Sequence, residues 1–83
     1  MSFRVVWETQ AENQLANLWM AAADRDAVTS SANEIDEILA NQGMMAGESR
    51  SDAVRILFCL PLGCYFQFRE VDQTMLVAKV WGC

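Results

Sequence analysis

Between Asp52 and Trp81 the chain contains three consecutive runs in which apolar side chains occupy alternate positions. Alternation with a period of two is typical of β-strands, because successive side chains point to opposite faces of a sheet. The runs cover residues 53–60, 62–69 and 74–81. One alternate set in each run is almost entirely apolar, and these sets are Val54, Ile56, Phe58 and Leu60; Leu62, Cys64, Phe66 and Phe68; and Thr74, Leu76, Ala78 and Val80. We therefore predict a three-stranded antiparallel meander with one apolar face.

The segment Pro61-Leu62-Gly63 sets the pairing of the first two strands. A three-residue loop, with the proline in a type I turn and the glycine in the left-handed conformation, fits this segment. It pairs Phe58 with Phe66, which keeps the apolar face continuous, and it sets Arg55 across from Arg69. A two-residue loop would mix apolar and polar positions on each face. We therefore predict the three-residue loop.

The second face of the meander is predicted to be basic and aromatic. It carries Arg55, Arg69 and Lys79, which are half of the six basic residues of the chain. The other members of this face are Leu57, Tyr65, Met75, Val77 and Trp81.

A first strand and a first helix are predicted before the meander. Residues 3–8 alternate so that Phe3, Val5 and Trp7 are expected to face the core. Thr9 and Glu12 have the spacing of a capping box, which predicts a helix from about Gln10 to Ala23. Its apolar stripe consists of Ala11, Leu15, Leu18, Trp19 and Ala22.

A second helix follows the charged segment at residues 24–26. Asp26 is predicted to cap it and Gly43 to end it. Its apolar stripe consists of Val28, Ala32, Ile35, Ile38 and Leu39. Residues 44–51 show neither period and are predicted to form a loop.

These elements predict a single α+β domain over residues 1–83. An N-terminal strand is followed by an antiparallel two-helix hairpin and the meander, with both helices on one face of the sheet. Two helices cover only one face of a four-stranded sheet, so the second face is expected to bind a partner. The expected partner-binding residues are Leu57, Tyr65, Met75, Val77 and Trp81, and the candidate phosphate clamp is Arg55, Arg69 and Lys79.

Composition and charge exclude several classes of function. A net charge of -5 argues against sequence-independent binding of nucleic acid, which requires a broad basic surface. No apolar run reaches the roughly 18 residues that cross a bilayer, and the first residues lack a signal sequence, so we expect a cytoplasmic protein. With no His and no ligand cluster, neither a metal nor a cofactor is expected. The predicted register puts Cys59 and Cys64 on opposite faces, so free thiols are expected.

The order of the motifs resembles that of a known toxin family. F-x-V-x-W is followed by a helix with Leu-x-x-Leu-Trp, a helix with Ile-Asp-x-Ile-Leu, then V-R-I-L-F-x-x-P-L-G-x-x-F-x-F and a closing V-x-x-V strand. This order resembles the RelE/ParE superfamily of toxins from bacterial type II toxin-antitoxin modules, often labelled plasmid stabilisation proteins. The resemblance covers essentially the whole chain. It implies a sheet curving over a helical hairpin and an antitoxin partner that wraps the toxin.

The resemblance leaves three functions open. The RelE branch cleaves messenger RNA on the ribosome, and Arg55 matches an arginine that helps hold phosphate there, whereas the ParE branch inhibits DNA gyrase. RelE-type nucleases are basic and commonly have a Tyr or His near the C-terminus, whereas this chain is acidic and its only tyrosine is Tyr65. We therefore favour a toxin-like protein that acts by binding gyrase or an altered target and is neutralised by a cognate antitoxin. The alternatives are a ribosome-dependent mRNA endonuclease, with Arg55 and Arg69 clamping phosphate, and a non-toxic module that forms homodimers.

Overall fold

A computed structural model describes residues 2–51 and 53–83, so Met1 and Asp52 of the predicted domain lie outside the described residues. The elements are β1 (Arg4–Trp7), α1 (Thr9–Ala21), α2 (Arg25–Gln42), a 3-10 turn η1 (Gly43–Met45), β2 (Glu48–Ser49), β3 (Arg55–Cys59), β4 (Leu62–Arg69) and β5 (Thr74–Gly82). The strands form one five-stranded sheet in the order β1-β5-β4-β3-β2. β1 runs parallel to β5, and the other neighbouring pairs are antiparallel.

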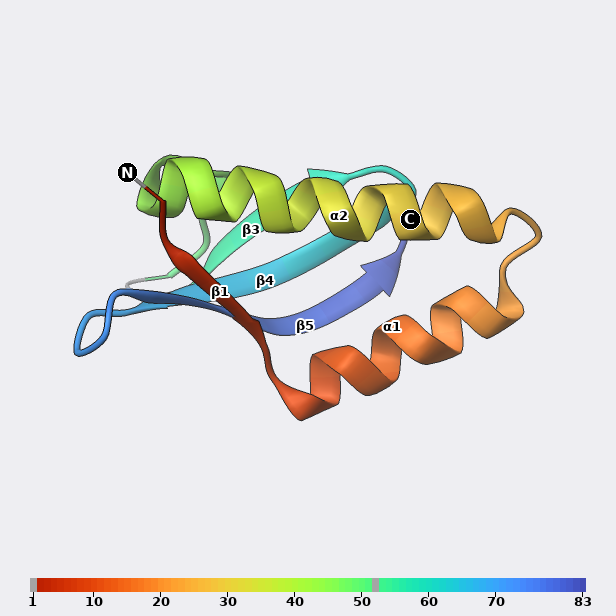
Figure 1. Ribbon diagram of the computed structural model, residues 1–83, viewed down its shortest axis with the longest axis horizontal. Helices are drawn as coiled ribbons and strands as arrows, with labels where there is room; N and C mark the ends of the chain where they lie inside the picture. Colours follow the sequence, from red (N-terminus) through yellow and green to blue (C-terminus); the bar gives the residue numbers. More distant parts are fainter. Residues whose placement is uncertain (1, 52) are drawn as a thin grey trace.

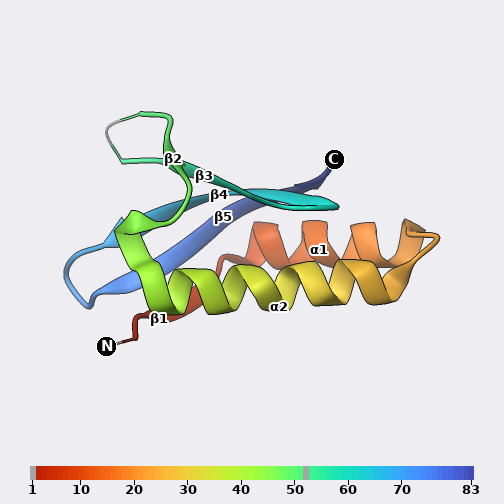
Figure 2. The same cartoon turned by 90° about the horizontal axis from the view of Figure 1, so that it is seen from above.

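The predicted fold class is confirmed. An N-terminal strand, a helical hairpin and a three-stranded meander follow one another as expected (Figure 1). Both helices lie side by side on the same side of the sheet, and among the described residues no helix covers the other side (Figure 2). The segment predicted as a loop, residues 44–51, contains part of η1 and the short edge strand β2.

Helix α1 begins one residue earlier than predicted. Glu8 is its N-cap and makes no side-chain capping bond, so the predicted capping box at Thr9 is wrong. The first turn is closed by the Glu12 N–H, which donates to the Glu8 carbonyl at 2.9 Å. Four members of the predicted apolar stripe pack in the core, namely Ala11, Leu15, Leu18 and Ala22. The fifth, Trp19, is 42% exposed and lines a hollow between α1 and α2.

The N-cap of helix α2 is Asp24, so the prediction of Asp26 as the cap is wrong. The helix therefore begins two residues earlier than predicted, at Arg25. The Asp24 carboxylate accepts a hydrogen bond from the Ala27 N–H at 3.1 Å. Gly43 ends the helix as predicted, with a φ of +54° and its N–H donated to the Leu39 carbonyl. All members of the predicted stripe contact the core, namely Val28, Ala32, Ile35, Ile38 and Leu39.

The predicted register of β3 and β4 is wrong. Cys59 pairs with Leu62, so the connection is two residues long and consists of Leu60 and Pro61, which are joined by a cis peptide bond. Relative to the prediction, each side chain of β3 therefore points to the opposite face of the sheet. Leu57 and Cys59 are buried, whereas Phe58 is 52% exposed and Leu60 is 75% exposed.

A β-bulge changes the facing of side chains along β5. Phe66 pairs with Val77 and Tyr65 pairs with Lys79, so Ala78 is an extra residue on β5. The bulge shifts the alternation by one position. Of the predicted core-facing set Thr74, Leu76, Ala78 and Val80, only Val80 belongs to the core cluster. Met75 and Val77, which were predicted to face outward, are fully buried in it.

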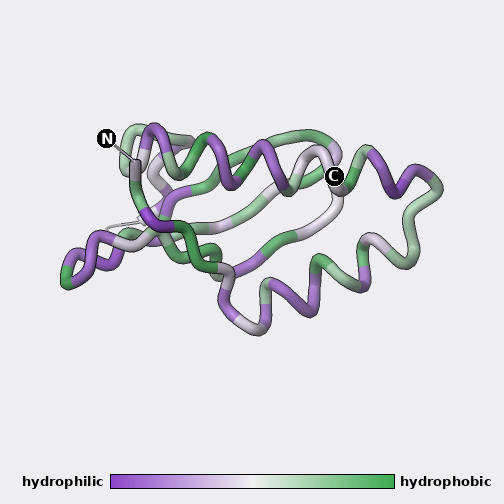
Figure 3. Tube along the Cα trace, in the orientation of Figure 1, coloured by the Kyte–Doolittle hydropathy of each residue, from purple (hydrophilic) through white to green (hydrophobic). Residues whose placement is uncertain are grey.

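The core lies between the sheet and the two helices. Its largest fully buried side chains come from α2 and from the two central strands, namely Ile35, Leu39, Leu62, Phe66, Met75 and Val77. Hydrophilic and hydrophobic residues alternate along both helices, as expected for helices with one face on the core (Figure 3). Across the described residues, no helix has the length and apolar character needed to cross a membrane.

Candidate protein-interaction site

The face of the sheet that the helices leave bare carries an aromatic cluster. Phe58, Gly63 and Trp81 form one row across β3, β4 and β5. The adjacent row consists of Ile56, Tyr65 and Lys79. We call Phe58, Tyr65 and Trp81 the aromatic patch.

The rings of the aromatic patch contact one another. The ring centroids of Tyr65 and Trp81 are 4.8 Å apart, and those of Phe58 and Trp81 are 6.2 Å apart in an edge-to-face arrangement. Gly63 makes this packing possible, because a Cβ at that position would lie 2.8 Å from atoms of the Trp81 indole. The indole therefore lies directly over the backbone of β4. The patch is a preformed apolar surface, and Phe58 is its most exposed member.

The three basic residues of the predicted phosphate clamp do not come together. Arg55 pairs with Phe66 and therefore points to the helix side, whereas Arg69, three residues after Phe66 on β4, points to the bare side. The Arg55 guanidinium donates hydrogen bonds to the carbonyls of Ala46 at 2.9 Å and Gly47 at 3.0 Å. It holds the segment that leads into β2. The prediction that Arg55 and Arg69 lie on the same face is thus wrong, because the turn between β3 and β4 has two residues rather than three.

Arg69 forms an ion pair within the β4–β5 turn. Its guanidinium contacts the Asp72 carboxylate at 2.7 Å, and both side chains are partly exposed. The hydrogen bond from Arg69 lowers the pKa of the Asp72 carboxyl to about 2. Lys79, in contrast, is exposed beside Tyr65. Of the three residues of the predicted clamp, Lys79 is therefore the one that pairs with a residue of the aromatic patch.

The predicted partner-binding residues divide into two groups. Leu57, Met75 and Val77 lie in the core, where no partner can reach them. Tyr65 and Trp81 are half-buried on the bare face, where the sequence placed them. Sequence reasoning missed Phe58, which it assigned to the core. The signal that could have found it is Gly63, because a glycine inside a strand often marks the close approach of another group.

The cysteines have different environments from those predicted. Cys59 and Cys64 are both buried on the helix side of the sheet, and all three thiols are free. Burial raises the pKa of Cys59 from 9.0 to about 11. Burial likewise raises the pKa of Cys64 from 9.0 to about 12. Cys83 is exposed at the end of the chain.

Native protein treated with a disulfide reagent at pH 8 is expected to react rapidly at Cys83 alone, because only thiolates attack and the other two thiols are buried and protonated. All three cysteines should react in denaturant. Above pH 9 the thiols of the unfolded chain ionise while the folded ones do not, so the free energy of unfolding should fall as pH rises. Mass spectrometry of the labelled protein counts the modified cysteines. Rapid native labelling of Cys59 or Cys64 would contradict their placement.

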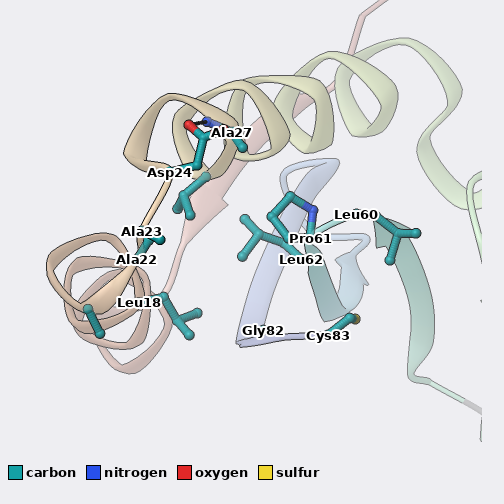
Figure 4. A pocket seen from close by; sticks show the side chains of 12 residues that line it. Leu18, Ala22, Ala23, Asp24, Ala27, Leu60, Pro61, Leu62, Gly82 and Cys83 are labelled. Atoms are coloured by element: carbon teal, nitrogen blue, oxygen red, sulfur yellow. Dashed lines mark hydrogen bonds between the residues drawn. The ribbon is translucent and has the colours of Figure 1, made fainter.

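Two hollows flank the helices. The first, of about 680 Å³, lies between the tip of the helical hairpin and the β3–β4 turn (Figure 4). Leu18 and Ala22 line one wall, and Pro61 and Leu62 line the other. The second, of about 670 Å³, lies between α1 and α2. Within residues 2–51 and 53–83, no group of three or more His, Cys, Asp or Glu side chains is placed to hold a metal ion.

Comparisons with known proteins place the fold. No family model matches the chain, and no curated protein matches it. Among solved structures, a chain of the toxin-antitoxin complex RelBE2 from Mycobacterium tuberculosis matches with a TM-score of 0.79 and 13% identity, over 100% of both chains. A chain of the chromosomal ParDE toxin-antitoxin system from P. aeruginosa matches with a TM-score of 0.65 and 18% identity, over 98% of this chain and 96% of that one.

These likenesses define a fold class. The chain has the fold of proteins found in bacterial toxin-antitoxin complexes. In particular, its two-helix hairpin on a mixed sheet is the RelE/ParE-like fold.

Proposed function

We propose that the chain, as one domain, is the toxin-like component of a type II toxin-antitoxin pair, acts in the cytoplasm, and is neutralised by a cognate antitoxin. The observation that carries this proposal is the match to a chain of the RelBE2 toxin-antitoxin complex over the full length of both chains, with a TM-score of 0.79. A similar match to a chain of the ParDE system supports it.

We propose further that the protein acts by binding a protein target, gyrase or another, through the aromatic patch. Aromatic side chains in a preformed cluster are typical anchors of protein interfaces, because they bury a large area with little loss of conformational freedom. Phe58 supplies the most exposed ring, and Lys79 adds a charge at the edge. Tyr65 and Trp81 form the half-buried base of this surface.

Binding is favoured over RNA cleavage by the arrangement of the basic residues. The cleavage hypothesis depended on Arg55 and Arg69 facing each other across two strands. They point to opposite sides of the sheet, and each is engaged in hydrogen bonds with the protein itself.

Induced expression of the chain in a bacterial host is expected to arrest growth, and co-expression of the adjacent gene is expected to relieve the arrest. A Phe58→Ser variant should lose the effect, because its ring is the exposed anchor of the patch. Colony counts before and after induction measure the result, with soluble protein levels checked for each variant.

Val71→Ser is the matched control, because Val71 is an apolar residue of the β4–β5 turn that is 94% exposed and lies outside the patch. This variant should arrest growth like the parent chain. Two outcomes would count against the proposal: no growth effect together with no copurifying product of the neighbouring gene, or a Phe58→Ser variant as toxic as the parent.

A further inference from the structure

The hollow between the tip of the helical hairpin and the β3–β4 turn is an apolar cavity that the proposed function does not use (Figure 4). Its volume of about 680 Å³ lies within the range of about 300–1,000 Å³ that is typical of small-molecule sites. Val28 and Leu62 form its buried floor, at 5% and 1% exposed. Four of the residues that line its helical wall are alanines, whose methyl groups leave the space open: Ala21, Ala22, Ala23 and Ala27.

Two hydrogen bonds fix the turn that forms the other wall of this hollow. The hydroxyl of Ser31, a buried residue of α2, donates to the Leu60 carbonyl at 2.8 Å. The N–H of Cys83 donates to the Pro61 carbonyl, also at 2.8 Å. The turn is therefore attached both to α2 and to the end of β5. Because the hollow is preformed, little of the binding free energy of a ligand is lost in ordering the protein.

The opening of the hollow is acidic. Among the described residues that line it, Asp24 is the only one with a charged side chain. Arg25 does not line the hollow, and its guanidinium lies over the Trp19 ring, 4.6 Å from the ring centroid. The N-terminus of α2 by itself would attract an anion, but Asp24 already caps it and Asp26 lies in its first turn. The field at the opening therefore favours a cation.

We propose that this hollow binds a small molecule with an apolar body and one ammonium group. The body covers Leu18, Leu62 and Leu60, of which Leu60 is 75% exposed, and so removes apolar surface from water. The ammonium group contacts the Asp24 carboxylate at the opening. A side chain of a second copy of this chain is a weaker occupant, because two copies that each carry a net charge of -5 repel each other. The proposal goes beyond the proposed function and does not require the aromatic patch to bind its target.

Three probes that share one apolar body test the proposal: phenylbutylamine, phenylbutanol and phenylbutanoate. At neutral pH the amine is positive, the alcohol is uncharged and the carboxylate is negative. Titration followed by NMR chemical shifts should show the amine binding at least roughly tenfold more tightly than the carboxylate, with the alcohol between them. Added salt should reduce this difference, because Asp24 is exposed to solvent. The largest shifts are expected at Ala22, Ala27 and Leu60.

Two variants of the protein separate the effect of charge from that of space. Asp24→Asn should abolish the preference for the amine while it keeps the helix cap, because asparagine caps about as well as aspartate. Ala27→Trp fills the hollow and should weaken binding of all three probes at least roughly fivefold. Glu37→Gln is the matched control for the loss of one charge, because Glu37 is exposed on α2 and does not line the hollow. It should leave the preference unchanged.

Four results would overturn the proposal. They are equal binding of the three probes, no binding of the amine, a preference that Asp24→Asn leaves intact, and shift changes centred on the aromatic patch. A dimer of the chain alone, detected by sedimentation and dissociated by Leu60→Ser, would also overturn it, because the hollow would then hold a second copy. Circular dichroism checks that each variant is folded, and the result for Asp24→Asn decides the matter if Ala27→Trp is not.

Discussion

A Leu57→Asp variant is expected to be unfolded at room temperature, whereas a Phe58→Asp variant, one residue further along β3, is expected to be folded. Leu57 is 9% exposed and belongs to the core cluster, and Phe58 is 52% exposed on the bare face. A carboxylate without a partner in the core is expected to cost at least about 4 kcal/mol. A domain of this size has only about 5–15 kcal/mol of stability to lose.

Far-ultraviolet circular dichroism and thermal denaturation distinguish the two variants. The Phe58→Asp protein should melt within a few degrees of the parent chain, because the new charge remains in water. The opposite result, with Phe58→Asp unfolded and Leu57→Asp folded, would show that the three-residue loop predicted from the sequence is correct after all.

A Gly47→Val variant is expected to lose at least about 3 kcal/mol of stability, because valine is strongly disfavoured at positive φ and the site has no room for a side chain. Gly47 has a φ of +63°. A Cβ at this position would overlap the backbone carbonyl of Ile56, which cannot move aside without distorting β3. The carbonyl of Gly47 also accepts a hydrogen bond from Arg55, so the anchor of that side chain is expected to be disturbed as well.

Urea denaturation measures this loss as a lower midpoint. Gly82→Ala is the matched control, because a Cβ there would lie 3.3 Å from Leu18 Cδ2, the end of a side chain that can adjust. Its midpoint should change little. A Gly47→Val protein as stable as Gly82→Ala would show that the 46–48 segment does not have the backbone described here.

Helices were predictable from the sequence because each has an apolar stripe with a period that only a helix satisfies. In α2 every predicted stripe residue contacts the core. The exception in α1 is Trp19, which is adjacent to the core-facing Leu18 on the helix surface. An exposed tryptophan is the less common case, so hydrophobicity alone assigned it to the core.

The facing of the strands was not predictable to the same degree, because the apolar residues of β3 occupy both alternate sets. Leu57 and Cys59 are as suitable for a core as Ile56 and Phe58, so the turn had to decide between them. Gly63 was assigned to that turn. In the structure it lies in β4, where the lack of a side chain leaves room for the Trp81 indole of the neighbouring strand. That contact joins residues far apart in the sequence, and no local pattern reveals it.

The bulge explains why the prediction for β5 was half correct. Lys79 and Trp81 face outward as expected, but Met75 and Val77 do not, because Ala78 interrupts the alternation between them. The aromatic patch therefore lies on the face of the sheet that the sequence indicated, but the sequence identified only Tyr65 and Trp81 of its three residues.

The bulge absorbs the extra residue Ala78, so Trp81 faces outward even though it is separated by an even number of positions from the buried Val77. Regular alternation from the buried Val77 would turn Trp81 inward and Val80 outward, whereas the bulge does the reverse. An in-frame deletion of the Ala78 codon would remove the bulge and leave regular alternation from Val77 to Trp81, with the indole still facing outward. Genes that differ by one codon at this place would therefore display the same indole, because a bulge accommodates the added residue without turning the rest of the strand over.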